Sequence, residues 1–173
     1  MNLGITGHRP HKLGGYNEYT NLCWPLQDKM NSFFVEKNPS RIISGLALGT
    51  DQWAVATALG LGIEVTALIP CKNQEQLWPT SAQIEYWRLL KDIAASRGGE
   101  VRYVSDKPYD KWCMHNRNRE IVENSSEMLA VWDGTRGGTR DCVRLAKSEG
   151  LAITILHPQT LEFSRIGTEE VQE

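Results

Sequence analysis

Residues 128–150 read MLAVWDGTRGGTRDCVRLAKSEG, and this stretch decides the expected fold. Met128–Trp132 is a short apolar run, which is typical of a strand that is buried on both faces. Asp133–Gly138 is a glycine-rich turn, and Thr139–Glu149 has the length of a helix, with Gly150 just past its end. A buried strand that turns directly into a helix indicates a parallel sheet covered by helices.

The same alternation extends over most of the chain. Five further apolar runs are expected to be strands: Leu3–Thr6, Arg41–Ser44, Ile63–Ile69, Val101–Val104 and Ala152–Leu156. Four longer segments are expected to be helices: one that begins at about Asn17 or nearer Trp24 and ends at Lys37, then Asp51–Leu61, Thr80 or Ser81 to Arg97, and Lys111–Asn124. Thr50 and Thr80 or Ser81 have suitable side chains for N-caps.

This order of elements predicts a three-layer, Rossmann-like α/β fold, in which helices cover both faces of a parallel sheet. We expect one domain over residues 1–158, because no linker, repeat or low-complexity segment interrupts the pattern. Residues 159–173 are polar and are expected to form a loosely held C-terminal tail.

Composition narrows the class of protein. The 173 residues carry a net charge of −2, which does not favour a nucleic-acid partner. No two of the four cysteines form a CxxC motif, so we expect reduced thiols. The four histidines are not spaced as metal ligands, so we expect no metal site. Neither a signal peptide nor a membrane-spanning run is visible. We therefore expect a cytoplasmic protein without membrane attachment.

Three loops that follow expected strands carry candidate ligand-binding residues, because ligands of open α/β sheets bind at the carboxyl ends of the strands. The first loop offers a guanidinium that can fork onto a phosphate and a glycine that lets the backbone approach it. Its candidates are Thr6, Gly7, His8 and Arg9.

The second and third loops each run from a strand through glycines into a helix, and the free N–H groups of a helix N-terminus form an anion site. The second loop contributes Ser44, Gly45, Leu46, Gly49, Thr50 and Asp51. Asp51 can either cap the helix or accept a ribose hydroxyl. The third loop contributes Asp133, Gly134, Gly137, Gly138 and Thr139.

The helical segment Met114–Glu120 adds Arg117 and Asn118, which lie near the start of a helix leading to the strand before the third loop. One of them can reach the ligand. Arg119 is better explained as part of a solvated face.

Together these motifs resemble the SLOG superfamily, which includes the LOG phosphoribohydrolases and the DNA-processing protein DprA, over about residues 2–156. The opening Thr6–Pro10 and the segment Ser44–Asp51 resemble its DUF1273 or YpsA-like branch in particular. LOG enzymes carry Met-His-x-Arg-Lys before a strand and Pro-Gly-Gly-x-Gly-Thr-x-x-Glu after it. The resemblance places Arg117 at the catalytic arginine and Asn118 at the lysine.

The catalytic glutamate of that signature has two possible counterparts. An ungapped register places Asp141 there, whereas aligning Gly138-Thr139 with the signature's Gly-Thr places Cys142 there. An aspartate is one methylene shorter than a glutamate, and a shift of about 1 Å in a catalytic group can cost on the order of 100-fold in rate. Arg117 and Asp141 are therefore catalytic candidates only if the protein is an enzyme.

Three functions remain open. The first is binding of a nucleotide-derived molecule, such as ADP-ribose, cyclic ADP-ribose, NAD or a nucleoside monophosphate, by a sensor, regulator or sequestering protein without a cofactor. The second is a LOG-type nucleoside 5′-monophosphate phosphoribohydrolase or related N-glycosidase. The third, which the charge disfavours, is binding of single-stranded DNA as in DprA. The resemblance also implies a homo-oligomer.

Overall fold

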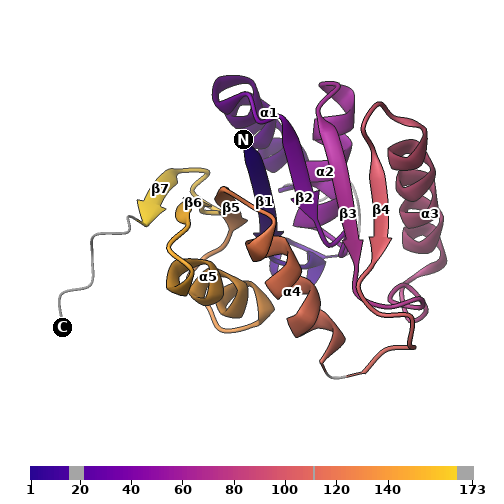
Figure 1. The fold of residues 1–173 in the computed structure, drawn as a ribbon. Coiled ribbons are helices and arrows are strands. Elements are labelled where there is room, and N and C mark those ends of the chain that lie inside the picture. Colours follow the sequence, from indigo (N-terminus) through magenta and orange to yellow (C-terminus); the bar gives the residue numbers. More distant parts are fainter. Residues whose placement is uncertain (16–21, 111, 167–173) are drawn as a thin grey trace.

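A seven-stranded sheet between two layers of helices forms the protein (Figure 1) in the computed structural model, which describes residues 1–15, 22–110 and 112–166. The strand order across the sheet is β4-β3-β2-β1-β5-β6-β7. The strands are β1 (Asn2–Gly7), β2 (Arg41–Ser44), β3 (Glu64–Ile69), β4 (Glu100–Tyr103), β5 (Glu127–Val131), β6 (Ala152–Leu156) and β7 (Phe163–Ile166). All neighbouring strands are parallel except β6 and β7, which are antiparallel.

The strand order reverses next to β1. The chain proceeds from β1 through β2 and β3 to β4 at one edge, and then returns to place β5 on the other side of β1. The connections after β1 and after β5 therefore leave the sheet in opposite directions, and the space between them is the topological switch point where such folds bind ligands.

The helices form two layers. In Figure 1, α4 (Cys113–Glu123) and α5 (Gly138–Ser148) lie in front of the sheet, and α1 (Cys23–Lys37) and α2 (Thr50–Gly60) lie behind it. Helix α3 (Thr80–Ala95) packs beside α2 and against β3 and β4. A single 3-10 turn, η1 (Pro10–Lys12), follows β1.

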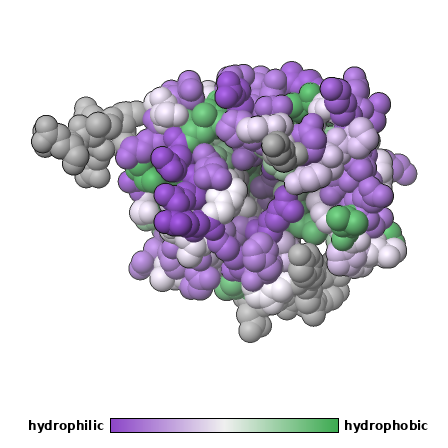
Figure 2. Space-filling view, turned by 90° about the horizontal axis from the view of Figure 1, so that it is seen from below, coloured by the Kyte–Doolittle hydropathy of each residue, from purple (hydrophilic) through white to green (hydrophobic). Residues whose placement is uncertain are grey.

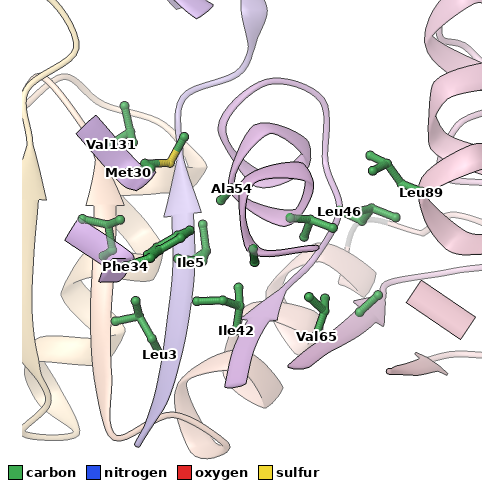
Figure 3. Packing of buried hydrophobic residues seen from close by; sticks show 14 of the residues in the cluster. Leu3, Ile5, Met30, Phe34, Ile42, Leu46, Ala54, Val65, Leu89 and Val131 are labelled. Carbon is green, nitrogen blue, oxygen red and sulfur yellow. The ribbon is translucent and has the colours of Figure 1, made fainter. Parts of the chain in front are cut away.

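Alternating side chains of the central strands fill two separate hydrophobic cores, one on each face of the sheet. Leu129 and Val131 of β5 belong to the core under α1, α2 and α3, with Leu3 and Ile5 of β1 (Figure 3). Met128 of β5 belongs to the second core, under α4 and α5. The prediction that this strand is buried on both faces is confirmed.

The predicted Rossmann-like α/β class is confirmed, and the expected strands and helices lie within one to two residues of their observed bounds wherever the structure describes them. Residues 17–21 of the first expected helix and residue 111 of the fourth lie outside the described residues. Within the described residues, no helix is both long enough and apolar enough to span a membrane.

The C-terminal region differs from the expectation of a loosely held tail over residues 159–173. Phe163–Ile166 forms β7, which pairs antiparallel with β6, and the ring of Phe163 stacks on Phe33 of α1 at 5.3 Å between ring centroids. This strand was hard to predict from the sequence because it has only four residues and lies at a sheet edge, where half of its backbone groups need no partner strand.

The two predicted N-caps are wrong. Gly49 and Pro79 occupy the N-cap positions of α2 and α3, and neither helix has a side-chain cap. Thr50 is instead the first residue of α2, and its hydroxyl donates to the carbonyl oxygen of His8 at 3.1 Å. The hydroxyl thus joins α2 to the loop after β1 rather than capping its own helix.

Candidate functional site at the switch point

A cavity of about 340 Å³ opens at the carboxyl ends of β1 and β5, and we call it the switch-point cavity. Figure 2 looks onto this edge of the molecule and shows a hollow near the centre of a mostly hydrophilic face. The cavity is lined by Ile5, Thr6, Gly7, His8, Arg9, His11, Lys12, Ala47, Asp51, Met114, Arg117, Asn118, Ile121, Arg136, Gly137, Gly138 and Thr139. Four permanent cations, Arg9, Lys12, Arg117 and Arg136, face one carboxylate, Asp51.

The loop after β1 approaches α2 so closely that only glycine fits at position 7. A Cβ on Gly7 would lie 2.5 Å from the side chain of Thr50. Both the backbone N–H and the hydroxyl of Thr50 donate to His8 O, at 3.3 and 3.1 Å. This contact fixes the start of α2 against the loop and holds His8 and Arg9 at the cavity wall.

A chain of polar contacts joins the loop after β1 to the glycine-rich loop after β5. His8 Nε2 lies 2.6 Å from Asp133 Oδ1, and the same carboxylate accepts hydrogen bonds from the backbone and the hydroxyl of Thr135. Lys12 Nζ donates to Thr135 Oγ1 at 2.6 Å and to the carbonyl oxygen of Arg136 at 2.8 Å. The two loops therefore form one preorganised wall.

The protonation states of His8 and Asp133 follow from their surroundings. Burial lowers the pKa of the His8 imidazole by more than the neighbouring Asp133 carboxylate raises it. For Asp133, burial alone would raise the pKa, but hydrogen bonds from Thr135 and His8 outweigh it and hold the pKa of the carboxyl well below its usual range. Both shifts describe a neutral imidazole that donates to a charged carboxylate.

The first turn of α5 forms the floor of the cavity on the side of β5. Gly137, at the N-cap, has a φ of 145°, which favours glycine, and Gly138 and Thr139 follow it. The N–H groups of a first helical turn have no acceptor within the helix, and the helix dipole adds partial positive charge there. This part of the cavity is suited to an anion.

Helix α5 places the two possible counterparts of the catalytic glutamate on different faces. Its buried positions are Thr139, Cys142, Val143 and Ala146, so Cys142 points inward and Asp141 is exposed and outside the cavity lining. The inward thiol is a poor nucleophile, because burial raises the pKa of Cys142 to about 11 although a hydrogen bond with Thr6 opposes the rise.

Helix α4 brings a buried arginine to the opposite side of the cavity. Asp110 Oδ1 accepts the backbone N–H groups of Trp112 and Cys113 at 2.7 and 2.8 Å, which satisfies the start of α4. One turn later, Arg117 Nη1 lies 3.6 Å from Asp51 Oδ2, and both side chains are more than nine-tenths buried. Arg117 Nε donates to Asn118 Oδ1 at 2.9 Å.

This ion pair is incomplete. Within the described part of the chain, Nη1 of Arg117 is buried without a hydrogen-bond partner. Burial raises the pKa of the Asp51 carboxyl, whereas Arg117 and the backbone N–H of Ala47 favour its charged form. Asp51 therefore contacts Ala47 and Arg117 rather than capping its own helix, and the unpaired buried Nη1 of Arg117 marks a place for water or ligand.

Ten of the predicted site residues line the switch-point cavity: Thr6, Gly7, His8, Arg9, Asp51, Arg117, Asn118, Gly137, Gly138 and Thr139. The other eight predicted site residues lie outside the lining of the cavity. Ser44, Gly45, Leu46, Gly49 and Thr50 shape the second loop, Asp133 holds His8, and Gly134 and Asp141 are exposed outside the lining.

Three basic side chains that line the cavity were not among the predicted site residues: His11, Lys12 and Arg136. Arg136 lies within a predicted loop, so its position next to the glycines was a usable signal. No signal in the sequence pointed to Lys12, because its hydrogen-bond partners are 123 and 124 residues away in sequence. Among the described residues, no group of three or more histidine, cysteine or acidic side chains is arranged to hold a metal ion.

Replacing Gly45 tests whether Arg117 depends on the shape of the second loop. In Gly45→Ala, the new Cβ would lie 1.3 Å from Arg117 Nη1, so the guanidinium must leave Asp51. We expect a loss of about 1–3 kcal/mol in the free energy of unfolding, measured by urea denaturation. Gly60→Ala is the matched control, since a Cβ there meets nothing within 4 Å. Equal effects of the two substitutions would contradict the account.

The His8 imidazole predicts a pH dependence of stability. Because its folded-state pKa is lowered from about 6.5, its contribution is complete above that pH and is lost as the pH falls. Urea denaturation at about pH 7.5 and 5.5 should show a larger loss of stability for the wild type than for His8→Gln. A larger loss in His8→Gln would mean that folding raises the pKa instead. The lowered pKa of Asp133 adds a further loss only below about pH 4.

Comparison with known proteins finds relatives of similar sequence. A protein from the SPbeta prophage of Bacillus subtilis, YoqJ, is 29% identical over 150 residues, which cover 77% of this chain and 88% of that protein. A UPF0398 protein of Lactobacillus johnsonii is 25% identical over 145 residues, with 79% and 75% covered.

Two solved structures share the fold. DNA processing protein A from Helicobacter pylori, described for its single-stranded DNA binding mode, superposes with a TM-score of 0.65 at 23% identity. DprA from Streptococcus pneumoniae superposes with a TM-score of 0.61 at 18% identity. The superpositions cover 91% and 89% of this chain, but only 65% and 49% of those chains. The model of the YspA SLOG family (YpsA) matches residues 3–161, and the chain belongs to this family.

Proposed function

We propose that the protein binds a nucleotide-derived small molecule, with its phosphate held in the switch-point cavity. The observation that carries this proposal is the meeting of the first turn of α5 with Arg9, Lys12 and Arg136 in one cavity of about 340 Å³. Backbone N–H groups at a helix N-terminus and the side chains of arginine and lysine commonly bind phosphate oxygens in proteins. Cavities of roughly 300–1,000 Å³ hold small organic ligands.

The opposite side of the cavity suits the sugar of such a ligand. Asp51 and Asn118 offer oxygen and amide groups to hydroxyls, and Arg117 Nη1 lacks a hydrogen-bond partner within the described residues. A ligand with a phosphate at one end and hydroxyls at the other would satisfy both sides. Sensor, regulator and sequestering protein are all compatible roles for such a binder.

Binding is favoured over hydrolysis of the base–ribose bond because, among the described residues, the one carboxylate in the cavity lining, Asp51, is held in an ion pair with Arg117. Asp141 is exposed outside the lining. Asp133 accepts hydrogen bonds from His8 and Thr135, and Asp51 is paired with Arg117. General acid–base catalysis needs a group within reach of the reacting atoms and with a suitable pKa.

Single-stranded DNA is the second candidate ligand. The same four cations can meet a nucleic-acid backbone, and one of the similar structures is described by its binding of single-stranded DNA. The net charge of −2 disfavours this candidate but does not remove the local positive charge. The homo-oligomer implied by the family stays a prediction.

Calorimetric titration with ribose 5-phosphate and AMP tests the proposal. Both should bind the wild type, and Arg136→Ala should weaken both at least tenfold, because a charge-assisted hydrogen bond contributes about 1.5–3 kcal/mol. Arg119→Ala is the matched control, since Arg119 is exposed on α4 and outside the cavity. Both ligands should be recovered intact by mass spectrometry.

Three results would contradict this assignment in different ways. No binding of either phosphate at millimolar concentration would remove it. Release of free base from AMP would favour the enzyme. Tight binding of oligo(dT) with a steep dependence on salt, without binding of the small phosphates, would favour DNA.

A further inference from the structure

A second and larger cavity, of about 600 Å³, lies in the helical layer behind the sheet, and we call it the helix-layer cavity. It is surrounded by the N-terminal halves of α1, α2 and α3, together with part of the loop after β1. Its lining includes Pro10, Trp24, Gln52, Trp53 and Glu85. None of these residues lines the switch-point cavity.

The two cavities lie on opposite sides of one wall. Arg9 lines the switch-point cavity and Pro10 the helix-layer cavity, and on α2 the same holds for Asp51 and Gln52. The hydrogen bonds from Thr50 to His8 O close this wall. A ligand in one cavity therefore does not occupy the other.

Aromatic rings form part of the helix-layer cavity. Trp53 is partly buried against the hydrophobic core, so its ring is held by the fold. Trp24, on the facing helix α1, is 66% exposed although it is a large aromatic side chain. A flat heteroaromatic ring can stack on such indole side chains. This stacking stabilises the complex whichever base the ring belongs to.

One polar side chain in the lining has unused hydrogen-bonding capacity. Gln52 is 6% exposed, and its amide nitrogen makes only a long bond of 3.4 Å to Leu46 O. Among the described residues its amide oxygen has no partner, and this oxygen can accept an N–H of a ligand. This oxygen is not one of the fully buried unpaired atoms, so a ligand in the cavity can reach it.

The charged side chains of the lining favour an uncharged ring over a phosphate. Among the described residues, no lysine or arginine is in the lining. Its carboxylate, Glu85, is already paired with Arg88 at 2.6 and 2.8 Å.

We propose that the helix-layer cavity binds an uncharged heteroaromatic ring of the nucleobase type, stacked on Trp24 and Trp53 and donating an N–H to Gln52. This second site goes beyond the proposed phosphate site. Because the two cavities share the wall formed by the loop after β1, its occupant contacts the same backbone that positions Arg9.

The probe is 2-aminopurine riboside, which has an exocyclic amine and no phosphate and whose fluorescence is quenched when it stacks. We expect saturable quenching with the wild type and an affinity at least tenfold lower for Trp24→Ala. Trp87→Ala is the matched control, since Trp87 is 50% exposed on the same helical layer but outside the lining. Gln52→Met should also weaken binding, with its folding checked by thermal denaturation.

Competition separates this inference from the phosphate proposal. Ribose 5-phosphate should not displace the riboside, and Arg136→Ala should bind the riboside as the wild type does. Displacement by ribose 5-phosphate, together with loss in Arg136→Ala, would place the ring in the switch-point cavity and overturn this inference alone. Absence of saturable quenching at millimolar concentration, or equal effects of Trp24→Ala and Trp87→Ala, would also overturn it.

Discussion

Hydrogen bonding of β1 to β2 on one side and to β5 on the other fixes where every loop of the site begins. Because β1 pairs with β5 in parallel register from Leu3–Glu127 to Gly7–Val131, the loops that follow the two strands begin next to each other at the same edge of the sheet. His8 N continues this pairing by donating to Val131 O at 3.0 Å. The close approach of the Thr6–Lys12 segment and the glycine-rich loop is therefore a consequence of the sheet.

Polar contacts then turn this proximity into a rigid site. Lys12, His8 and Asp133 join the two loops, and Asp51 with Arg117 joins α2 to α4 across the cavity. These groups leave the backbone N–H groups of α5 and the guanidinium groups of Arg9 and Arg136 available for a ligand. Preorganisation of this kind reduces the entropy that a bound anion would otherwise cost.

Local patterns in the sequence were enough to predict the fold, since each buried strand and amphipathic helix has its own periodicity, and only the short edge strand Phe163–Ile166 was missed. Most loop residues of the site were also predictable, because they follow strand ends. It was harder to predict in which direction the side chains of the site point. The spacing of Cys142, Val143 and Ala146 does predict an inward face that excludes Asp141, whereas the contacts of Lys12 depend on tertiary structure alone.

A crystal structure of the protein with AMP tests the central claim most directly, because it locates the phosphate. The account predicts phosphate oxygens within about 2.7–3.2 Å of the backbone nitrogens of Gly138 and Thr139, with a guanidinium of Arg9 or Arg136 completing the shell. A phosphate bound outside the switch-point cavity, with the first turn of α5 making no contact to it, would contradict the account.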